Sequence, residues 1–309
     1  MLSICIPTYN RRERIEKNLK EISSYIRNNK LYKKVQIVVS NNNSKDDTKY
    51  FLEKFLEQNK DIDLKIYNQL KDLEIQKNQI FVVEKADKEY FMWLSDDDYI
   101  SEEYLLKVLE IIKRSSGKII SIIPSYQHIS KDNELLNKGR DFNKLDKKYE
   151  KGFKTALLHS WKAHQMSGLV FSRNILTIFN ERRVNNLYPF IFFSTYSQLK
   201  GEFYYLTESP VKITAGVKKY WNYGKDGLIN GIMENFKKIY EISYLERVIL
   251  EIHFLLIQKW RYLQYRFKIY KLYKELLLCE NMTIITKVLL GPIIIIMVIY
   301  SILKKFFRV

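Results

Sequence analysis

Cysteine, glycine and proline are scarce in this sequence of 309 residues, which contains 2, 10 and 5 of them. The two cysteines, Cys5 and Cys279, lie far apart, and neither has the spacing of a metal-ligand or redox pair. A disulfide framework is therefore excluded, and a reducing compartment is expected. No basic segment precedes the first apolar stretch, so the start of the chain does not resemble a secretory signal.

Acidic residues are too few to balance the basic ones. The chain has 52 Lys and Arg against 35 Asp and Glu, which gives a formal net charge of +17. Such an excess suits nucleic acid, an anionic membrane surface or phosphate-bearing substrates. Hydrophobic residues make up 46% of the chain, so a substantial core is expected, as one large α/β domain with appendages.

Apolar runs alternate with amphipathic stretches through the first 123 residues. Strands are expected at 2–7, 34–40, 64–67, 89–94 and 118–123, and helices at 11–28, 46/47–58, 73–86 and 101–113. This alternation predicts an α/β fold, Rossmann-like, with a mostly parallel sheet and helices on both faces. Further strands are expected at 168–171 and 203–206, and the polar residues 131–154 are interpreted as a surface connection. Asn10 is expected to cap the first helix.

Polar residues follow three of the predicted strands. They are residues 8–11 (Thr-Tyr-Asn-Arg), 41–44 (Asn-Asn-Asn-Ser) and 95–98 (Ser-Asp-Asp-Asp). In open sheets of this kind ligands bind beyond the carboxyl ends of the strands. We therefore expect the three clusters to converge there.

The third cluster contains three consecutive carboxylates, Asp96, Asp97 and Asp98, which we call the aspartate triplet. Adjacent like charges are unfavourable unless water or a cation offsets them, so the triplet predicts a site for an oxygen-liking ion such as Mn²⁺ or Mg²⁺. Asp97 is the first choice for the metal ligand because its side chain points away from its two neighbours in an extended chain. The alternative is that Ser95 and Asp98 only cap the helix at 101–113.

Together these residues resemble the successive motifs of family 2 glycosyltransferases with the GT-A fold. The resemblance covers about the first 115 residues, and the Trp-x-x-Asp-Asp-Asp form of 93–98 is similar to the abequosyltransferase-like branch, which builds bacterial surface polysaccharides. It implies an inverting transferase that uses a nucleotide diphosphate sugar, with uridine as the expected nucleoside and Mn²⁺ or Mg²⁺ as the cofactor. The motifs that carry it are residues 4–11, residues 37–48, Asn78 and residues 93–98.

The resemblance also assigns roles to individual residues. Asp97 matches the second aspartate of the family's DxD motif and is the expected metal ligand and a catalytic residue, together with Asp98. Asn41 stands where the family usually has a base-recognising aspartate, and it keeps an acceptor and a donor for uracil. Ser95 replaces the first DxD aspartate, and glycines usual after Asn68 and before Glu89 are missing. The expected nucleotide-sugar-binding residues are Pro7, Thr8, Asn10, Arg11, Asn41, Lys77, Asn78 and Asp96.

The expected general base is not identified by the sequence. Family members often place an acidic pair some ninety residues beyond the metal motif, but residues 186–194 contain no acid. The nearest candidates are Glu181, His164 and Glu202, each of which also suits an ordinary surface or packing role. A hydroxyl acceptor needs a base within hydrogen-bond reach, so this position stays open.

The C-terminal third combines basic, aromatic and apolar residues. Every charged residue between 259 and 274 is basic, six aromatic residues lie among them, and residues 288–303 carry no charge. Without glycine or proline between 231 and 291, this part is expected to form long helices. The composition suits an anionic membrane surface, a helix packed on the sheet, or nucleic acid. The apolar tail is short for a transmembrane helix, and Gly291-Pro292 can break or angle it.

We therefore predict a GT-A domain at 1–216, a basic aromatic helical region at 217–283 and a hydrophobic membrane-associating tail at 284–309. Residues 1–115 would bind the nucleotide sugar and 116–216 the acceptor. The expected function is transfer to a lipid-linked or surface-polysaccharide glycan at the cytoplasmic face of the cytoplasmic membrane, by a peripheral or tail-anchored protein. The alternatives are a catalytically silent nucleotide- or glycan-binding scaffold and a basic nucleic-acid binder, and no nucleic acid is expected as a partner.

Overall fold

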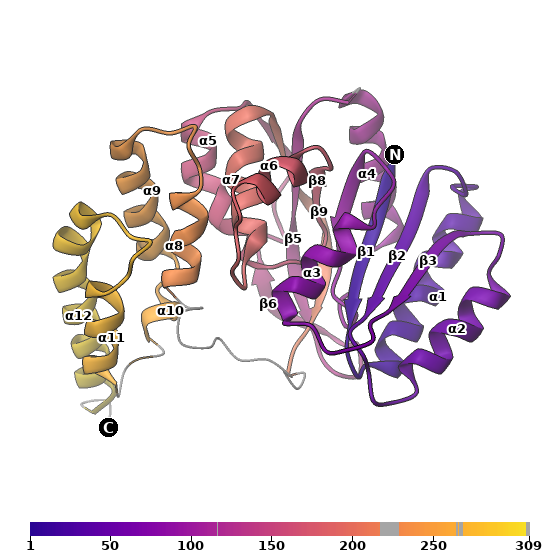
Figure 1. The fold of residues 1–309 in the computed structure, drawn as a ribbon, viewed down its shortest axis with the longest axis horizontal. Coiled ribbons are helices and arrows are strands. Elements are labelled where there is room, and N and C mark those ends of the chain that lie inside the picture. The colour runs from indigo at the N-terminus through magenta and orange to yellow at the C-terminus, as the bar shows by residue number, and fades with distance from the viewer. Residues whose placement is uncertain (116, 217–228, 264, 266–267, 307–309) are drawn as a thin grey trace.

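The computed structural model describes residues 1–309 except 116, 217–228, 264, 266–267 and 307–309 (Figure 1). For residues 301–306 it describes the backbone but not the side chains. Its strands are β1 (Leu2–Thr8), β2 (Val35–Asn41), β3 (Asp63–Asn68), β4 (Tyr90–Trp93), β5 (Ile120–Ile129), β6 (Leu135–Arg140), β7 (Lys147–Tyr149), β8 (Leu169–Ser172) and β9 (Glu202–Thr214). In these residues they form one nine-stranded sheet in the order β3-β2-β1-β4-β8-β5-β9-β7, with β6 paired to β5.

The sheet is mixed, which corrects the prediction of a mostly parallel one. β3, β2, β1 and β4 are parallel, as predicted. β8, however, lies antiparallel between β4 and β5, and beyond it β5 and β9 are parallel to each other. The lysine-rich residues 131–154 also contain β6 and β7, which the sequence did not predict because their side chains are mostly exposed and carry no apolar alternation.

Helices cover both faces of the sheet, as predicted. In the first half they are α1 (Arg12–Asn28), α2 (Thr48–Gln58), α3 (Ile75–Glu84) and α4 (Glu102–Ser115). They are followed by α5 (Phe153–His159), the 3-10 helix η1 (Ser160–His164), α6 (Ile175–Glu181) and α7 (Pro189–Lys200).

Side chains alternate between two cores along the strands. Ile4 and Ile37 contribute to one core with α1, α2 and α4, whereas Cys5 and Val38 contribute to the other with α3, α6 and α7. Period-2 alternation of buried residues on both faces is what a sheet covered on each side requires.

The described part of the C-terminal third forms five helices at one end of the molecule, next to α5 and α7 (Figure 1). They are α8 (Asn230–Lys237), α9 (Tyr244–Ile257), α10 (Trp260–Leu263), α11 (Ile269–Leu277) and α12 (Ile284–Phe306). The prediction of long helices holds for α12, with 23 residues, but not for α8, α10 and α11, which have 8, 4 and 9 residues. Ser243 explains one boundary, since its capping box with Glu246 starts α9 without glycine or proline nearby.

The hydrophobic core is continuous from the sheet into these helices, because Trp93, Phe254 and Ile294 belong to one buried cluster. α12 continues through Pro292, so Gly291-Pro292 does not end the helix. No helix of the described residues is long and apolar enough to cross a bilayer. The predicted boundaries at 216 and 283 stay predictions, and residues 217–228, Arg266 and Arg308 lie outside the described part of the chain.

Candidate active site

The parallel half of the sheet brings the three polar clusters to one edge. Thr8 pairs with Asn41 at the ends of β1 and β2, and Asn41 pairs with Asn68 at the end of β3. β4 lies on the other side of β1, with Trp93 beside Cys5, so the aspartate triplet follows at the same edge. This convergence, predicted from topology, is present in the structure, and we call this side of the sheet the carboxyl edge.

The loop of residues 95–98, which we call the aspartate loop, is held by a side chain of α1. The Nδ2 atom of Asn18 donates to the carbonyl oxygens of Ser95 (3.1 Å) and Asp98 (2.8 Å). The next helix, α4, is capped by Ser101, whose Oγ accepts a hydrogen bond from the Tyr104 amide. Capping therefore does not explain Ser95 or Asp98, and the alternative of a cap alone is wrong.

The three carboxylates have different surroundings. Asp96 is buried and accepts a hydrogen bond from Thr8 Oγ1 at 2.7 Å. Asp98 is buried and accepts hydrogen bonds from Ser167 Oγ at 2.5 Å and the Thr214 amide at 3.0 Å. Asp97 is the member that reaches solvent, with 15% of its side chain exposed.

Burial, followed by the negative charge of Asp97, raises the pKa of Asp96 to about 7 and the pKa of Asp98 well above its usual range. The charge crowding expected from the sequence is therefore real, and it is greatest at the two buried members. A cation beside Asp97 lowers the energy of all three ionised carboxylates. The electrostatics thus favour a cation on the solvent side of the triplet.

Arg11 already supplies a positive charge at that place. Its Nη1 lies 2.5 Å from Asp97 Oδ2, while Ser95 Oγ donates to Asp97 Oδ1 at 2.6 Å. Among the described residues, no three His, Cys, Asp or Glu side chains are grouped as metal ligands. Asp97 is the carboxylate of the triplet that reaches solvent, and a single carboxylate suffices where substrate phosphates and water complete the shell of Mg²⁺.

Asn10 links the first two polar clusters. Its backbone has φ of 51°, its amide donates to Ser44 Oγ at 2.8 Å, and its Oδ1 accepts from the Lys45 amide at 2.7 Å. The N-cap position of α1 is occupied by Arg11, without a capping hydrogen bond from its side chain. The prediction that Asn10 caps α1 is therefore wrong, and its role is to join the loops after β1 and β2.

Asn41 and Asn78 are buried and serve the same loops. The Oδ1 atom of Asn41 accepts from the amide and the hydroxyl of Ser44, and its Nδ2 donates to Asn68 Oδ1 at 2.9 Å. Asn78 accepts from Ser40 Oγ at 2.6 Å, so α3 is tied to the end of β2. Contact between Asn41 and a nucleotide base would require exchange of these partners.

Two further predicted residues differ in exposure. Pro7 is half-buried near the end of β1, next to the carboxyl edge. Lys77 is exposed on α3 and forms an ion pair with Glu74 at 3.2 Å. Pro7 thus lies near the carboxyl edge, whereas the Lys77 ammonium is paired with the residue just before its own helix.

Three residues that position the triplet were missed from the sequence: Asn18, Ser167 and Thr214. Asn18 gave a signal, since it interrupts the apolar face of α1 and is fully buried there. A buried amide needs partners, which predicts a backbone contact but does not name it. Ser167 lies two residues before β8, and Thr214 is the last residue of β9. Nothing in the sequence predicted that β8 inserts between β4 and β5.

The three candidate bases lie in different parts of the fold. Glu202 begins β9, whose other end carries Thr214 beside Asp98, so Glu202 lies at the opposite edge, ion-paired with Lys148 at 2.7 Å. Glu181 is exposed at the end of α6. His164 differs from the other two because its neighbour in the sequence contacts the triplet. The Nε2 atom of Gln165 donates to Asp98 Oδ2 at 3.4 Å.

His164 is a weak base in this position. Its Nδ1 lies 3.1 Å from the Trp161 carbonyl oxygen, and its ring stacks on the indole of Trp161. Burial, and then the positive charge of Arg140, lowers the pKa of His164 to about 3. The imidazole is therefore neutral at physiological pH, and the base remains unassigned.

We expect the His164→Asn variant to resist mild acid better than the wild type. Because the folded-state pKa of about 3 is below the ordinary 6.5, the unfolded chain binds the proton first, and stability is lost as the pH falls from about 6.5 to about 3. Between pH 7 and pH 5 the wild type should lose about 1–2 kcal/mol more unfolding free energy than the variant. Urea denaturation at both pH values measures this, and equal losses would contradict it.

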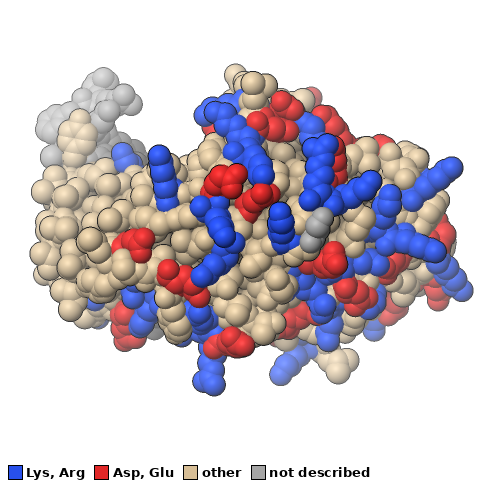
Figure 2. All heavy atoms as spheres, turned by 90° about the horizontal axis from the view of Figure 1, so that it is seen from above, with Lys and Arg blue, Asp and Glu red and all other residues tan. Residues whose placement is uncertain are grey.

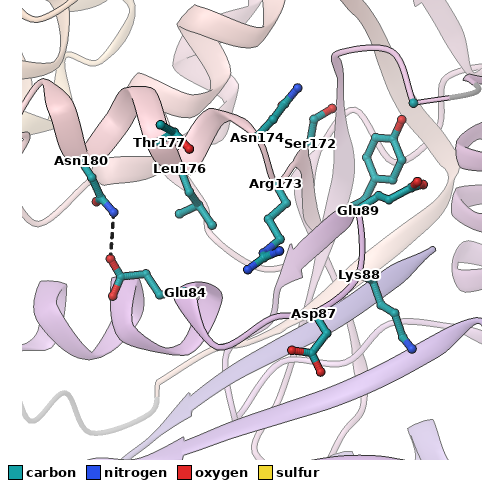
Figure 3. A pocket seen from close by; sticks show the side chains of 12 residues that line it. Glu84, Asp87, Lys88, Glu89, Ser172, Arg173, Asn174, Leu176, Thr177 and Asn180 are labelled. Atoms are coloured by element: carbon teal, nitrogen blue, oxygen red, sulfur yellow. Dashed lines mark hydrogen bonds between the residues drawn. The ribbon is translucent and has the colours of Figure 1, made fainter.

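A cavity of about 680 Å³ lies away from this site, at the amino end of β4 (Figure 3). Its wall is made by the end of α3, the start of β4 and the beginning of α6. Asn180 donates to Glu84 Oε1 across it at 3.0 Å, and Asp87 forms an ion pair with Lys65 at 2.6 Å. These exposed charges have partners, and no buried carboxylates meet there, so the carboxyl edge is the better candidate for chemistry.

Comparisons with known proteins agree with this geometry. Residues 3–173, more than half of the chain, match the model of glycosyl transferase family 2. A comparison with curated protein sequences finds no match.

Solved structures with a similar fold include residues 1–349 of TarS from S. aureus in complex with UDP-GlcNAc, with a TM-score of 0.65 and 13% identity over 89% of this chain and 80% of that one. The mannosyltransferase PcManGT from Pyrobaculum calidifontis, in complex with GDP-Man and Mn²⁺, has a TM-score of 0.57 and 13% identity over 98% and 86%. These likenesses show a shared α/β fold of the GT-A type. Since the matched residues also include all three polar clusters and the aspartate triplet, the chain belongs to glycosyl transferase family 2.

Proposed function

We propose that this protein transfers a sugar from a nucleoside diphosphate sugar, with uridine diphosphate sugars first among the candidates, to a glycan acceptor. The observation that carries the proposal is the position of Asp97: it is the solvent-facing carboxylate of the triplet, at the carboxyl edge, paired with Arg11. TarS, in complexes with UDP-GlcNAc and UDP, and PcManGT, in a complex with GDP-Man and Mn²⁺, support a nucleotide-sugar donor.

The leaving group of such a reaction is a nucleoside diphosphate, on which negative charge develops as the glycosidic bond breaks. A divalent cation supplies charge neutralisation when it is bound, and Asp97 is the residue that would hold it. Arg11 would then leave Asp97 and offer its guanidinium to the phosphates, for which its planar set of donors is suited. Ser95 orients Asp97, and Asn18 fixes the loop that carries both.

The proposal has three further parts. The reaction inverts the configuration at the anomeric carbon, the acceptor is a lipid-linked or surface-polysaccharide glycan, and the protein acts at the cytoplasmic face of the cytoplasmic membrane. The basic and aromatic composition of residues 259–274 supports an acceptor held at a bilayer. The Trp93 to Asp98 motif supports an abequosyltransferase-like branch. In the fold this tryptophan is a core residue, fully buried, with its Nε1 donating to the Gln79 carbonyl oxygen at 3.0 Å.

A screen of nucleoside diphosphate sugars with and without Mn²⁺ tests the donor. At a hundred times the dissociation constant a ligand stabilises the folded state by about 2.7 kcal/mol, which for a chain of this length corresponds to a rise of about 4 °C in the melting temperature. We expect this rise for a uridine diphosphate sugar with Mn²⁺ and a smaller one without it. If no donor raises the melting temperature in either condition, the proposal fails.

One observation favours a second candidate, a catalytically silent scaffold that binds a nucleotide or glycan. The helix α7, where family members often carry an acidic pair, has none, and its first residues are buried aromatic and aliphatic side chains. Release of nucleoside diphosphate separates the two candidates, because a scaffold would show the thermal shift without donor hydrolysis or transfer.

A further inference from the structure

The outer face of α12 is an uncovered apolar surface. Six of its side chains in the described part of the helix are 48% to 72% exposed: Ile284, Val288, Leu289, Ile293, Ile296 and Tyr300. At 100° per residue they lie within one half of the helix surface, along about 25 Å of its length. Apolar patches this continuous mark interaction sites.

The inner face of the same helix is packed. Leu290, Ile294 and Val298 follow one another at four-residue spacing, and all are buried against the core that includes α9 and α11. At the start of the helix, the Thr283 hydroxyl and amide donate to the buried Glu251 of α9 at 2.7 and 3.0 Å. A helix anchored in this way along its inner face cannot cross a bilayer without leaving the folded body.

The net charge of residues 259–309 indicates what kind of partner the outer face of α12 binds. Residues 259–309 contain ten Lys and Arg and two Glu, a net charge of +8, and no acid follows Glu280. Lys271 and Lys274 lie on α11, which packs beside α12, and Tyr270 on the same helix is 80% exposed. Figure 2 shows charged side chains of both signs over the sheet region and few at the end formed by the C-terminal helices.

We infer that the outer face of α12 lies flat in the interface of an anionic bilayer, with α9 to α11 behind it and the lysines of α11 at the headgroups. Apolar side chains and basic residues on one surface are the combination that binds such membranes. A second copy of the chain is a poorer occupant, because it would bring together two copies of a segment, residues 259–309, whose net charge is +8. The inference does not depend on sugar transfer, and it can be tested without donor or acceptor.

The test is cosedimentation of the full chain with vesicles of phosphatidylcholine alone and with 30% phosphatidylglycerol. We expect binding to the anionic vesicles, weaker binding at high salt, and at least a tenfold loss of affinity in the Val288→Glu, Ile296→Glu double variant. Leu145→Glu is the matched control, since Leu145 is 72% exposed in the sheet domain and should not alter binding. Thermal melts establish that both variants are folded.

Three outcomes would overturn the inference: no binding of the wild type to anionic vesicles, equal binding of wild type and double variant, or equal loss in the Leu145→Glu control. Sedimentation velocity in the absence of vesicles tests whether a second copy of the chain binds the outer face instead. A dimer that dissociates in the double variant would assign the outer face to a second copy. Donor turnover in solution, measured on the same samples, reports separately on the proposed transfer.

Discussion

The Asp97→Asn variant should lose transfer activity by at least about 10²–10³-fold while remaining folded, because removing one group that stabilises transition-state charge has effects of this size. Asparagine keeps the shape of the side chain and an oxygen for the Ser95 hydroxyl, but it removes the negative charge that would hold Mn²⁺ or Mg²⁺. Nucleoside diphosphate release across a Mn²⁺ titration measures the loss, and a melting curve verifies the fold. Full activity with an unchanged metal requirement would refute the role of Asp97.

Arg11→Ala provides the matched comparison, because it breaks the same ion pair from the other side. It leaves the Asp97 carboxylate in place, so Mn²⁺ should bind the free protein at least as tightly as in the wild type, by calorimetry. Affinity for the donor diphosphate should fall if the guanidinium also contacts the phosphates. Loss of Mn²⁺ binding in this variant would show that Arg11 supports the carboxylate rather than competing for it.

The Glu251→Ala variant should be destabilised by about 3–5 kcal/mol, the usual effect of removing one partner of a buried charge pair. Glu251 is fully buried, and its Oε1 accepts from Arg247 Nε at 2.8 Å while its Oε2 accepts from Thr283. Its loss removes the acceptor of Arg247 Nε and of the Thr283 amide and hydroxyl, so the guanidinium keeps only its hydrogen bond to the Asn281 carbonyl oxygen among the described residues. Urea denaturation gives the magnitude, and limited proteolysis should show earlier cleavage near the start of α12.

Glu251→Gln is the control for this prediction. The amide oxygen can still accept a hydrogen bond from Thr283 or Arg247, so a smaller loss of stability than in the alanine variant is expected. Equal melting behaviour of alanine variant and wild type would mean that packing of Leu290, Ile294 and Val298 alone holds α12 in place.

The sequence predicted the parallel half of the sheet well for a physical reason. β1, β2 and β4 are short apolar runs buried on both faces, and each is linked to the next by amphipathic helices of ordinary length, so local pattern and tertiary position agree. The antiparallel β8 was expected as a strand, but its neighbours were not. Pairing between β4 and β8 joins residues about eighty positions apart, and no local pattern encodes it.

The candidate site divides in the same way. Thr8, Asn41 and the triplet were found because they follow recognisable strands, and the motif order places them at one edge. The partners of the triplet come from distant segments: Thr214 is separated from Asp98 by 116 residues. A hydrogen bond of that range depends on the whole fold, so only the buried polar residue Asn18 could have been suspected beforehand.

The hydrogen bonds of Asp98 have a consequence for modular exchange between family members. The family match ends at residue 173, yet the amide that closes on Asp98 belongs to Thr214 at the far end of β9. Consider a chimera in which only residues 1–115 are transferred to another family member. Its aspartate loop would then face the recipient's counterparts of Ser167 and Thr214, which belong with a different loop. The conformation of the aspartate loop therefore depends on the second half of the sheet, and grafts that preserve it should have their crossover beyond β9.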